Sequence, residues 1–481
     1  MNEPHSKRIA IIGGGITGLA AAFRLNELQP SWKVTLLEAQ DRLGGILGTH
    51  HQDGFLIEQS ADNFLAGPNM PYAEAVCRRA GFADQLLETD KRYRKALVLS
   101  GGKLYPVPDG FQLMTPSKAW PILTSGLLSP AGKLRLLRER WIPPRTDDAD
   151  ESLASFALRR LGREAYEKLV QPLISGIYTA DPEQLSMQAA LPQFVQMERK
   201  FGSLTKAATS GSKQAQTKAA DSGARYSQFL GPKLGMQSLI DHLSKTISFE
   251  QCLTNSPVSA LRRQETTDAA NGGSWRIATS QVQDSFDGVI LTTSAHAASK
   301  LLQPVKSSVA ESLAAVTHAS STVVVLAFPT SAFPEPLQSF GCVIPAAERR
   351  QILAISFTSM KFPGRAPDGW HMLRIFLGGA LQPELAKLSD EESVHIATQE
   401  ARQILQLQGE PQVLKVVRWA DTMPQYHVGH PNRMATLQQK LAELPGLEIA
   451  GNAFAGVGIP QCVKSGEDAA ERLIQTLTGL G

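Results

Sequence analysis

The sequence predicts an α/β protein in which a Rossmann-like, dinucleotide-binding domain is combined with a mixed-sheet domain and a mainly helical insertion. Three observations lead to this prediction. A strand, a glycine-rich turn and a helix follow one another near the N-terminus. Strand-like and helical runs then alternate along the chain. Finally, the 481 residues exceed the roughly 250–300 residues that one hydrophobic core fills.

The first strand–turn–helix unit has the full pattern of a dinucleotide-binding βαβ motif. Residues 7–12 form an apolar strand, residues 13–18 read Gly-Gly-Gly-Ile-Thr-Gly, and residues 19–25 are strong helix formers. A second strand, 33–37, ends at Glu38. A glycine-rich surface turn would explain the glycines alone. It would not explain why a strand, a helix, a second strand and a terminal acid surround them at the expected spacing.

Each glycine of this motif, and the acid that follows it, has a physical role. Gly13 permits the tight turn, Gly15 lets the backbone approach a pyrophosphate, and Gly18 lets the helix pack on the strand. The phosphates would then lie at the positive end of the helix dipole. Glu38 is placed to accept hydrogen bonds from ribose hydroxyls, and its charge disfavours NADP. The candidate cofactor-binding residues of this unit are Gly13, Gly14, Gly15, Ile16, Thr17, Gly18, Glu38 and Ala39.

The residues after Glu38 distinguish between dinucleotides. Asp41-Arg42-Leu43-Gly44-Gly45 places an arginine and two glycines directly behind the ribose-binding acid. Arg42 can offset phosphate charge, and Gly44 and Gly45 let the backbone lie close to a long cofactor, with Ile46 beside them. A solvated surface arginine is the alternative for Arg42.

Composition narrows the class of protein further. The chain has 48 Lys and Arg against 45 Asp and Glu, and this net charge of +3 gives no reason to expect a nucleic-acid partner. Its four cysteines are far apart, which argues against disulfides or a zinc site and favours a cytoplasmic protein. No signal peptide precedes residue 9, and Lys118 and two prolines interrupt the most apolar stretch, 111–128, so no membrane span is expected.

These motifs resemble the FAD-containing amine-oxidase superfamily, whose members share a flavin domain of the glutathione-reductase type. Three later segments resemble the protoporphyrinogen and coproporphyrinogen oxidases of haem synthesis more specifically. They are Pro172-Leu-Ile-Ser-Gly-Ile-Tyr-Thr-Ala-Asp-Pro182, Met423-Pro-Gln-Tyr-His-Val-Gly-His430 and Ala450-Gly-Asn-Ala-Phe-Ala-Gly-Val-Gly-Ile-Pro-Gln-Cys462.

The resemblance implies further flavin-binding positions. It places Ser60, Ala61, Asp62 and Asn63 beside the flavin, Val258 near the adenine, and Trp419 near the ring system. The alternative for Val258 is an ordinary valine in a strand, and the alternative for Trp419 is a tryptophan of the hydrophobic core. The loop from Gly451 has glycines that let backbone N–H groups approach the pyrimidine edge of the isoalloxazine, and the resemblance implies that Val457, Gly458 and Ile459 line that edge.

The chain also departs from the family pattern. Ser60-Ala61 stands where many members have Gly-Pro, and Ala66-Gly67-Pro68-Asn69 stands where bacterial relatives often carry a basic residue. These departures put a simple transfer of substrate-carboxylate recognition in doubt.

The implied reaction is oxidation of a porphyrinogen, a small tetrapyrrole, by three hydride transfers to FAD with molecular oxygen as acceptor. The chain has no second glycine-rich turn followed by an acid, so no built-in NAD(P)H site is expected. No residue stands out as a catalytic acid or base. His427 and His430 lack a nearby third ligand, so no metal is expected. Another flavin oxidase, acting on an amine or a polyene, and a non-catalytic flavin-binding protein remain alternatives; hand-over of product to other haem-pathway enzymes also stays open.

The expected domain organisation is discontinuous. Residues 1–75, 231–300 and 443–481 form the FAD-binding domain, 76–110 and 301–442 the substrate-binding domain, and 111–200 the helical domain, with helices starting at Thr115-Pro116 and Ser129-Pro130. Residues 201–230, rich in Ser, Ala, Gly and Lys, are expected to form a mobile linker. Trp120, Leu127, Leu128 and Trp141 are typical either of peripheral membrane contact or of a helix packed over a substrate pocket.

Overall fold

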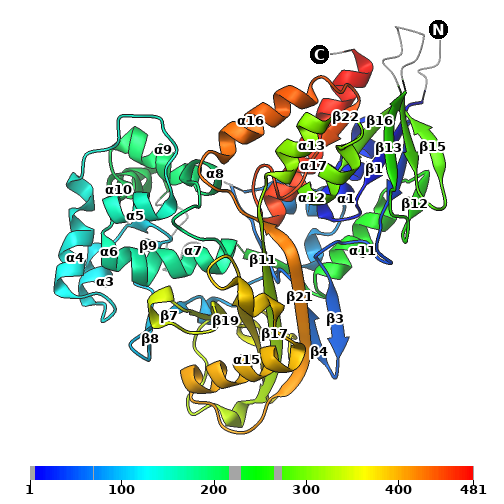
Figure 1. Cartoon of the computed structure of the whole chain (residues 1–481). Coiled ribbons are helices and arrows are strands. Elements are labelled where there is room, and N and C mark those ends of the chain that lie inside the picture. The colour runs from blue at the N-terminus through cyan, green and yellow to red at the C-terminus, as the bar shows by residue number, and fades with distance from the viewer. Residues whose placement is uncertain (1–5, 69, 216–228, 265–273, 480–481) are drawn as a thin grey trace.

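The computed structural model describes residues 6–68, 70–215, 229–264 and 274–479, which form three lobes (Figure 1). A Rossmann-like lobe holds the N-terminal strands and the C-terminal helix. A second lobe is built on a large mixed sheet, and a third is mainly helical. The predicted fold class is therefore confirmed.

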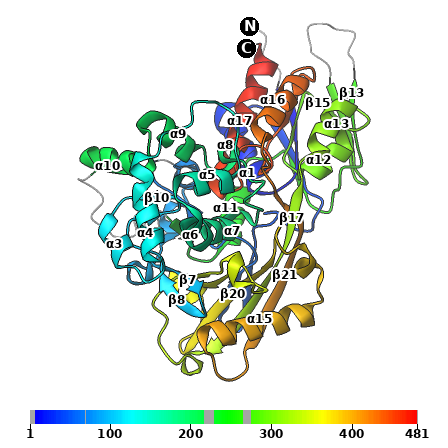
Figure 2. The same ribbon diagram turned by 60° about the vertical axis from the view of Figure 1, so that its left-hand side comes forward.

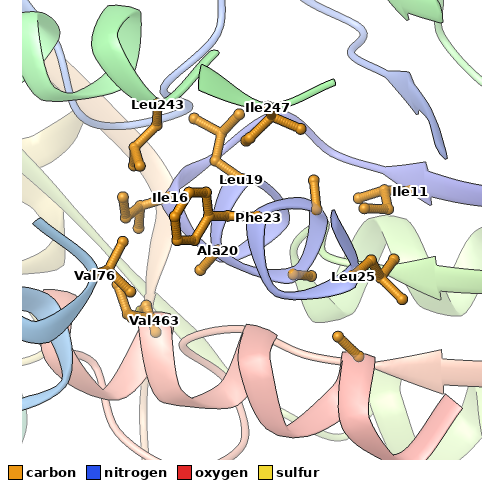
Figure 3. Packing of buried hydrophobic residues seen from close by; sticks show 14 of the residues in the cluster. Ile11, Ile16, Leu19, Ala20, Phe23, Leu25, Val76, Leu243, Ile247 and Val463 are labelled. Atoms are coloured by element: carbon orange, nitrogen blue, oxygen red, sulfur yellow. The ribbon is translucent and has the colours of Figure 1, made fainter. Parts of the chain in front are cut away.

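The Rossmann-like lobe is a five-stranded parallel sheet whose strands come from three distant parts of the chain. In spatial order the strands are β12 (Gln251–Leu253), β2 (Lys33–Leu37), β1 (Arg8–Ile12), β16 (Gly288–Leu291) and β22 (Leu447–Ile449). The helices α1 (Ile16–Leu28), α11 (Met236–Thr246) and α17 (Ile459–Thr478) supply one core, in which Leu19, Phe23, Leu243 and Val463 are buried (Figure 3). This continuous apolar packing explains why strands so far apart in sequence form one sheet.

The opposite face of this sheet is covered by elements that extend the lobe beyond its expected boundaries. The covering elements are α12 (Ala295–Leu302), α13 (Ser307–Ala314), α16 (His430–Leu441) and the antiparallel sheet of β13 (Ala260–Gln264), β14 (Ser274–Ala278) and β15 (Gln283–Phe286). Leu313, Leu437 and Leu441 share a core with Ile12 and Val289. The expected domain boundaries at residues 300 and 443 are therefore misplaced. Helices α13 and α16 bury their apolar faces against the Rossmann-like sheet and not against the mixed sheet.

The second lobe is a seven-stranded mixed sheet. In spatial order it contains β21 (Gln412–Pro424), β17 (His318–Pro329), β20 (Trp370–Gly378), β19 (Ala354–Phe357), β18 (Gly341–Val343), β7 (Ala96–Ser100) and β8 (Lys103–Pro106). Helix α15 (Asp390–Leu405) covers one face, where Val324, Leu326 and Ala397 are buried. The other face packs on the hairpin of β3 (Thr49–Gln52) and β4 (Phe55–Glu58), through Phe55 and Ile57.

A small sheet ties the two lobes together. It consists of β5 (Phe64–Leu65), β11 (Phe229–Pro232) and β6 (Leu86–Glu88), and α2 (Tyr72–Arg79) follows β5 in the chain. The residues expected beside the flavin, 60–63, directly precede β5. They therefore lie where the Rossmann-like lobe meets the mixed sheet.

The third lobe is helical and lies beside the other two in both views (Figures 1 and 2). Its helices are α3 (Ala119–Thr124), α4 (Pro130–Leu137), α5 (Leu153–Arg160), α6 (Arg163–Ala165), α7 (Gln171–Tyr178), α8 (Met187–Ala190), α9 (Pro192–Phe201) and α10 (Leu204–Ala215). Ser129 caps α4 as expected, with its Oγ accepting from the Gly132 N–H at 3.0 Å. Thr115–Pro116 does not start a helix; it forms strand β10, paired with β9 (Phe111–Gln112).

Helix α10 occupies part of the segment expected to be a mobile linker. Its N-terminus is capped by Glu139, whose carboxylate accepts hydrogen bonds from the Leu204 N–H at 2.9 Å and the Thr205 N–H at 3.0 Å. Arg160 pairs with the same buried carboxylate. The linker prediction is therefore wrong for 204–215, because the stabilising acid comes from a remote part of the sequence; residues 216–228 lie outside the described ranges.

Within the described ranges, no helix is both long and apolar enough to cross a membrane. All four cysteines are free thiols, as the sequence predicts.

Candidate functional site

The glycine-rich turn joins β1 to α1 with little room for side chains. Gly13 has φ +113°, which favours glycine. A Cβ on Gly18 would lie only 2.0 Å from the carbonyl oxygen of Gly13. The close approach of α1 to the end of β1 thus requires Gly18, as the motif predicts.

Gly15 faces open space instead. A Cβ built on it would meet no described atom within 4 Å. Gly15 is the N-cap of α1 and provides no side-chain hydrogen bond to the first N–H groups of the helix. The Gly44 N–H donates to the Gly14 carbonyl at 2.8 Å, so the second glycine segment forms a wall of the same space. The result is a cradle that a pyrophosphate fits by shape and by the helix dipole.

Glu38 lies beside this cradle and is only 8% exposed. Its carboxylate accepts hydrogen bonds from the Gly14 N–H at 2.6 Å and from the Gln40 N–H at 2.8 Å. Each carboxylate oxygen can accept a second hydrogen bond, so the side chain retains capacity for ribose hydroxyls. The Ser256 N–H donates to the Glu38 carbonyl at 2.8 Å, which brings the segment containing Val258 to the same place.

Arg42 makes its hydrogen bonds within and next to its own loop. Its guanidinium donates to the carbonyls of Leu47 at 2.7 Å and Gly45 at 2.9 Å, and to the Gln237 side chain at 3.2 Å. Arg42 therefore fixes the shape of the loop that carries Gly44 and Gly45. Direct compensation of phosphate charge by Arg42 stays a prediction. Ala39 and Ile46 lie at the surface of this region.

The segment 60–63 is held by buried charges from the mixed sheet. Asp62 forms an ion pair with Lys361 at 2.9 Å and lies 3.7 Å from the guanidinium of Arg374. Arg374, on β20, also donates to the Ser60 carbonyl, and Asn63 donates to Asp62 at 2.6 Å. Burial opposes ionisation of Asp62, but Lys361 and Arg374 outweigh burial and hold the pKa of its carboxyl below the usual range. Ala61 packs against the core of the Rossmann-like lobe.

A second buried carboxylate, Glu58, lies just before this segment. It accepts hydrogen bonds from the Thr49 hydroxyl at 2.8 Å and from the Met236 N–H, at the start of α11, at 2.9 Å. Burial raises the pKa of Glu58 to about 7, although these hydrogen bonds and Arg365 oppose the shift.

Replacing Glu58 with glutamine is expected to flatten the dependence of stability on pH. The folded-state pKa of about 7 lies above the unfolded value of about 4.3. The contribution of this group is therefore complete below about pH 4.3 and falls by roughly 4 kcal/mol as pH rises from there through 7. Urea unfolding of wild type and Glu58→Gln across this pH range measures the effect. Parallel stability curves for the two proteins would contradict it.

The C-terminal part of the Rossmann-like lobe contributes the loop 451–458, which lies between β22 and α17. Gly451 and Gly456 have φ of +143° and +134°, so the loop needs glycine at both positions. Gly458 is the N-cap of α17, which begins at Ile459 and has no side-chain cap. Free N–H groups at this helix start can face a ligand. Val457 packs against the core of the helical lobe.

Trp419 links the mixed sheet to the chain just before residues 60–63. Its indole Nε1–H donates to the Gln59 carbonyl at 3.0 Å. It also lines a cavity of about 430 Å³ between β17, β21 and the residues after α7, together with His318, Gln425 and His427. The cavity contains none of the glycine-turn residues and lies outside the pyrophosphate cradle.

The structure thus assembles most of the candidate residues at one place. The glycine turn, Glu38, Gly44 and the segment of Val258 surround the cradle, and residues 60–63 and Trp419 follow along the boundary between lobes. Three further residues at this boundary, Lys361, Arg374 and Tyr426, are not individually predicted by the sequence. Tyr426 was visible inside the Met423–His430 motif, whereas nothing near Lys361 or Arg374 signals their shared carboxylate.

The two histidines of that motif do not form a metal site. His430 is buried and stacks on Tyr426, with ring centroids 4.3 Å apart. Burial lowers the pKa of His430 to about 4, so the ring is neutral at physiological pH. Among the described residues, no group of three or more His, Cys, Asp or Glu side chains is arranged to hold a metal ion.

Comparison with known proteins gives full-length matches. The family model of flavin containing amine oxidoreductases matches residues 16–474. The coproporphyrinogen III oxidase of Bacillus subtilis (strain 168) is 33% identical, covering 96% of this chain and 97% of that protein. Protoporphyrinogen oxidase 2, chloroplastic/mitochondrial, of Arabidopsis thaliana is 28% identical, with coverages of 98% and 94%.

Solved structures agree with these matches. The crystal structure of a protein from Exiguobacterium sp. 255-15, named "putative protoporphyrinogen oxidase", has a TM-score of 0.82 and 30% identity, covering 98% of this chain and 99% of that chain. Reduced UDP-galactopyranose mutase has a TM-score of 0.72 at 16% identity, covering 99% and 96%, and so shares the fold.

Proposed function

Because the chain belongs to the flavin containing amine oxidoreductase family, we propose that it is an FAD-dependent oxidase that converts a porphyrinogen to the porphyrin in haem biosynthesis. Relatives named coproporphyrinogen III oxidase and protoporphyrinogen oxidase align over nearly the whole of both chains. The structural observation that carries the proposal is the open cradle at Gly15, against the N-terminus of α1. A dinucleotide pyrophosphate fits this space and the donors around it.

A bound FAD would supply the redox chemistry of the site, which is uptake of hydride from the substrate and transfer of electrons to molecular oxygen. The tetrapyrrole loses six electrons and six hydrogens in three rounds, and three oxygen molecules become three molecules of hydrogen peroxide. The substrate becomes aromatic, which favours the reaction.

The residues of this chain supply position and environment. We assign the adenosine end to Glu38 and the segment of Val258, the pyrophosphate to the turn at Gly15, and the ring system to the space between residues 60–63 and the loop 451–458. The Asp62–Lys361–Arg374 cluster holds residues 60–63 at a fixed place on the mixed sheet. A reacting carbon held at a fixed place against the cofactor would favour hydride transfer without an assigned acid or base.

Aerobic incubation of the purified protein with coproporphyrinogen III and, separately, protoporphyrinogen IX tests the proposal. We expect a yellow protein, an increase in porphyrin fluorescence, and three molecules of hydrogen peroxide per porphyrin. A colourless protein would exclude the flavin assignment. A yellow protein that is inert with both porphyrinogens, but oxidises an amine or a polyene, would place it elsewhere in the family.

The relative rates on the two substrates decide which is preferred. The bacterial relative, named for coproporphyrinogen III, is 33% identical and the plant relative, named for protoporphyrinogen, is 28% identical. We therefore expect coproporphyrinogen III to have the higher kcat/KM. A higher value for protoporphyrinogen IX would reverse this assignment.

Peripheral membrane contact through the helical lobe is part of the proposal. Trp120 and Trp141 are each 74% exposed, and Leu134 is also exposed, whereas Leu127 and Leu128 are buried in the lobe. The high exposure of the two tryptophans supports surface contact over packing above a substrate pocket. Exposed tryptophans on helices near basic side chains are typical of an interfacial surface.

Co-sedimentation with vesicles checks this contact. We expect binding to vesicles that contain anionic lipid and a clear loss of binding in the double variant Trp120→Ser/Trp141→Ser. Vesicles of neutral lipid serve as the control. Equal sedimentation of the two proteins with anionic vesicles would exclude these tryptophans as the contact.

A further inference from the structure

The segment Met423–His430 connects all three lobes. It begins with the last two residues of β21 in the mixed sheet. The Ser186 N–H donates to the Tyr426 carbonyl at 2.7 Å, and the Val428 N–H donates to the Gln184 carbonyl at 2.8 Å, so the segment is also bonded to the helical lobe. The Gly429 N–H donates to Asp150 of that lobe at 2.8 Å. The segment then enters α16, which packs on the Rossmann-like lobe.

The side chain of Tyr426 points from this segment to the loop 451–458. Its hydroxyl accepts a hydrogen bond from the Gly456 N–H at 2.8 Å and donates to the Asn452 carbonyl. The side chain is only 1% exposed, and its ring stacks on His430. Burial raises the pKa of Tyr426 well above its ordinary value, so the hydroxyl keeps the proton that it donates.

These two hydrogen bonds close the loop across four residues. The loop itself contains two glycines at positive φ, and such backbone is readily rearranged when it is not tied down. Asn452 also donates from its side chain to the Thr422 carbonyl at 3.3 Å, next to the same segment. Removing the hydroxyl would leave the Gly456 N–H, which is buried, without this acceptor.

We propose that Tyr426 is a positioning residue that fixes the loop 451–458 in the shape that receives the pyrimidine edge of the flavin. This inference rests on the proposed function, because it takes FAD as the ligand of that loop. The ring of Tyr426 lies in the core of the helical lobe, where Val457 also packs. The helical lobe therefore sets the position of backbone donors at the flavin through one hydroxyl group.

The test is the variant Tyr426→Phe, which keeps the ring and its stacking on His430. Titration of the apoprotein with FAD should show binding about tenfold weaker or more, as expected when a buried donor loses its acceptor. The loop N–H groups favour negative charge on the reduced flavin, so reduced FAD should lose more affinity than oxidised FAD. The midpoint potential should therefore become more negative, by about 30 mV for each tenfold difference between the two losses.

The control is Tyr166→Phe, which removes a hydroxyl from the same core of the helical lobe without touching the loop. It should leave the FAD affinity and the midpoint potential at the wild-type values. An unchanged affinity and potential in Tyr426→Phe would overturn the inference. Equal shifts in both variants would also overturn it, and so would failure of Tyr426→Phe to give folded apoprotein. Either result would mean that the hydroxyl stabilises the core of the helical lobe in general and does not position the loop.

These measurements use no porphyrinogen, so the inference and the proposed function fail separately. A wild-type protein that does not bind FAD would refute the proposed function. A wild-type protein that binds FAD and oxidises porphyrinogen, with Tyr426→Phe indistinguishable from it in affinity and potential, would refute only the role of Tyr426.

Discussion

Replacing Gly15 with valine is expected to give a folded protein that does not retain FAD. The backbone at Gly15 has φ −72°, which a valine adopts, and a Cβ there meets no described atom within 4 Å. The new side chain therefore occupies only the space assigned to the pyrophosphate. Steric exclusion of about 1–3 kcal/mol or more weakens binding by roughly 5- to 150-fold or more. The ratio of flavin absorbance to protein absorbance after purification measures the effect.

A matched variant in the same turn has the opposite expected result. Gly18→Ala places a Cβ 2.0 Å from the Gly13 carbonyl oxygen, so it should prevent α1 from packing on β1 and lower the yield of folded protein. Gly15→Val should keep the wild-type circular dichroism and unfolding curve of the apoprotein. Flavin retained by Gly15→Val at the wild-type ratio would mean that the pyrophosphate does not lie against this glycine.

Replacing Asp62 with asparagine is expected to destabilise the protein by about 3–5 kcal/mol, since it leaves buried charges without their counter-ion. Arg374 has a side chain only 2% exposed, and Lys361 is 17% exposed. Asp62 is the carboxylate within ion-pair distance of both. The midpoint of urea unfolding of the apoprotein at neutral pH measures the loss.

The stability that the ionised Asp62 contributes should decrease in acid. The folded-state pKa of Asp62 is lowered, so its contribution is complete above the unfolded value of about 3.9 and is lost as pH falls through the folded-state pKa. Wild type and Asp62→Asn should therefore converge in stability in acid. Asp147→Asn is the control, because Asp147 pairs with Arg145 at the surface and should change unfolding little. Equal effects of both substitutions would contradict the role of burial.

Local sequence patterns predicted the parts of the fold that depend on local chemistry. The turn 13–18 and the acid at Glu38 could be assigned because each residue acts on neighbours within one βαβ unit. The mixed sheet and the helical insertion followed from runs of strand-like and helical residues.

Long-range partners account for what the sequence could not predict. Helix α10 depends on Glu139, which lies more than sixty residues before it. Asp62 meets Arg374 because β20 passes beside residues 60–63, and it meets Lys361 because the chain passes the same carboxylate shortly before β20. The limits of the Rossmann-like lobe were misplaced because α13 and α16 have amphipathic faces that fit either sheet, and only tertiary packing shows which one they cover.

The order of strands in the Rossmann-like sheet has a consequence for synthesis on the ribosome. The edge strand β22 and the covering helix α17 come from residues 447–478, although β1 and β2 are complete by residue 37. At roughly 5–20 residues per second, the first strands wait on the order of 20–80 s for these partners. The sheet that carries the glycine turn can therefore be completed only when synthesis of the chain is nearly finished.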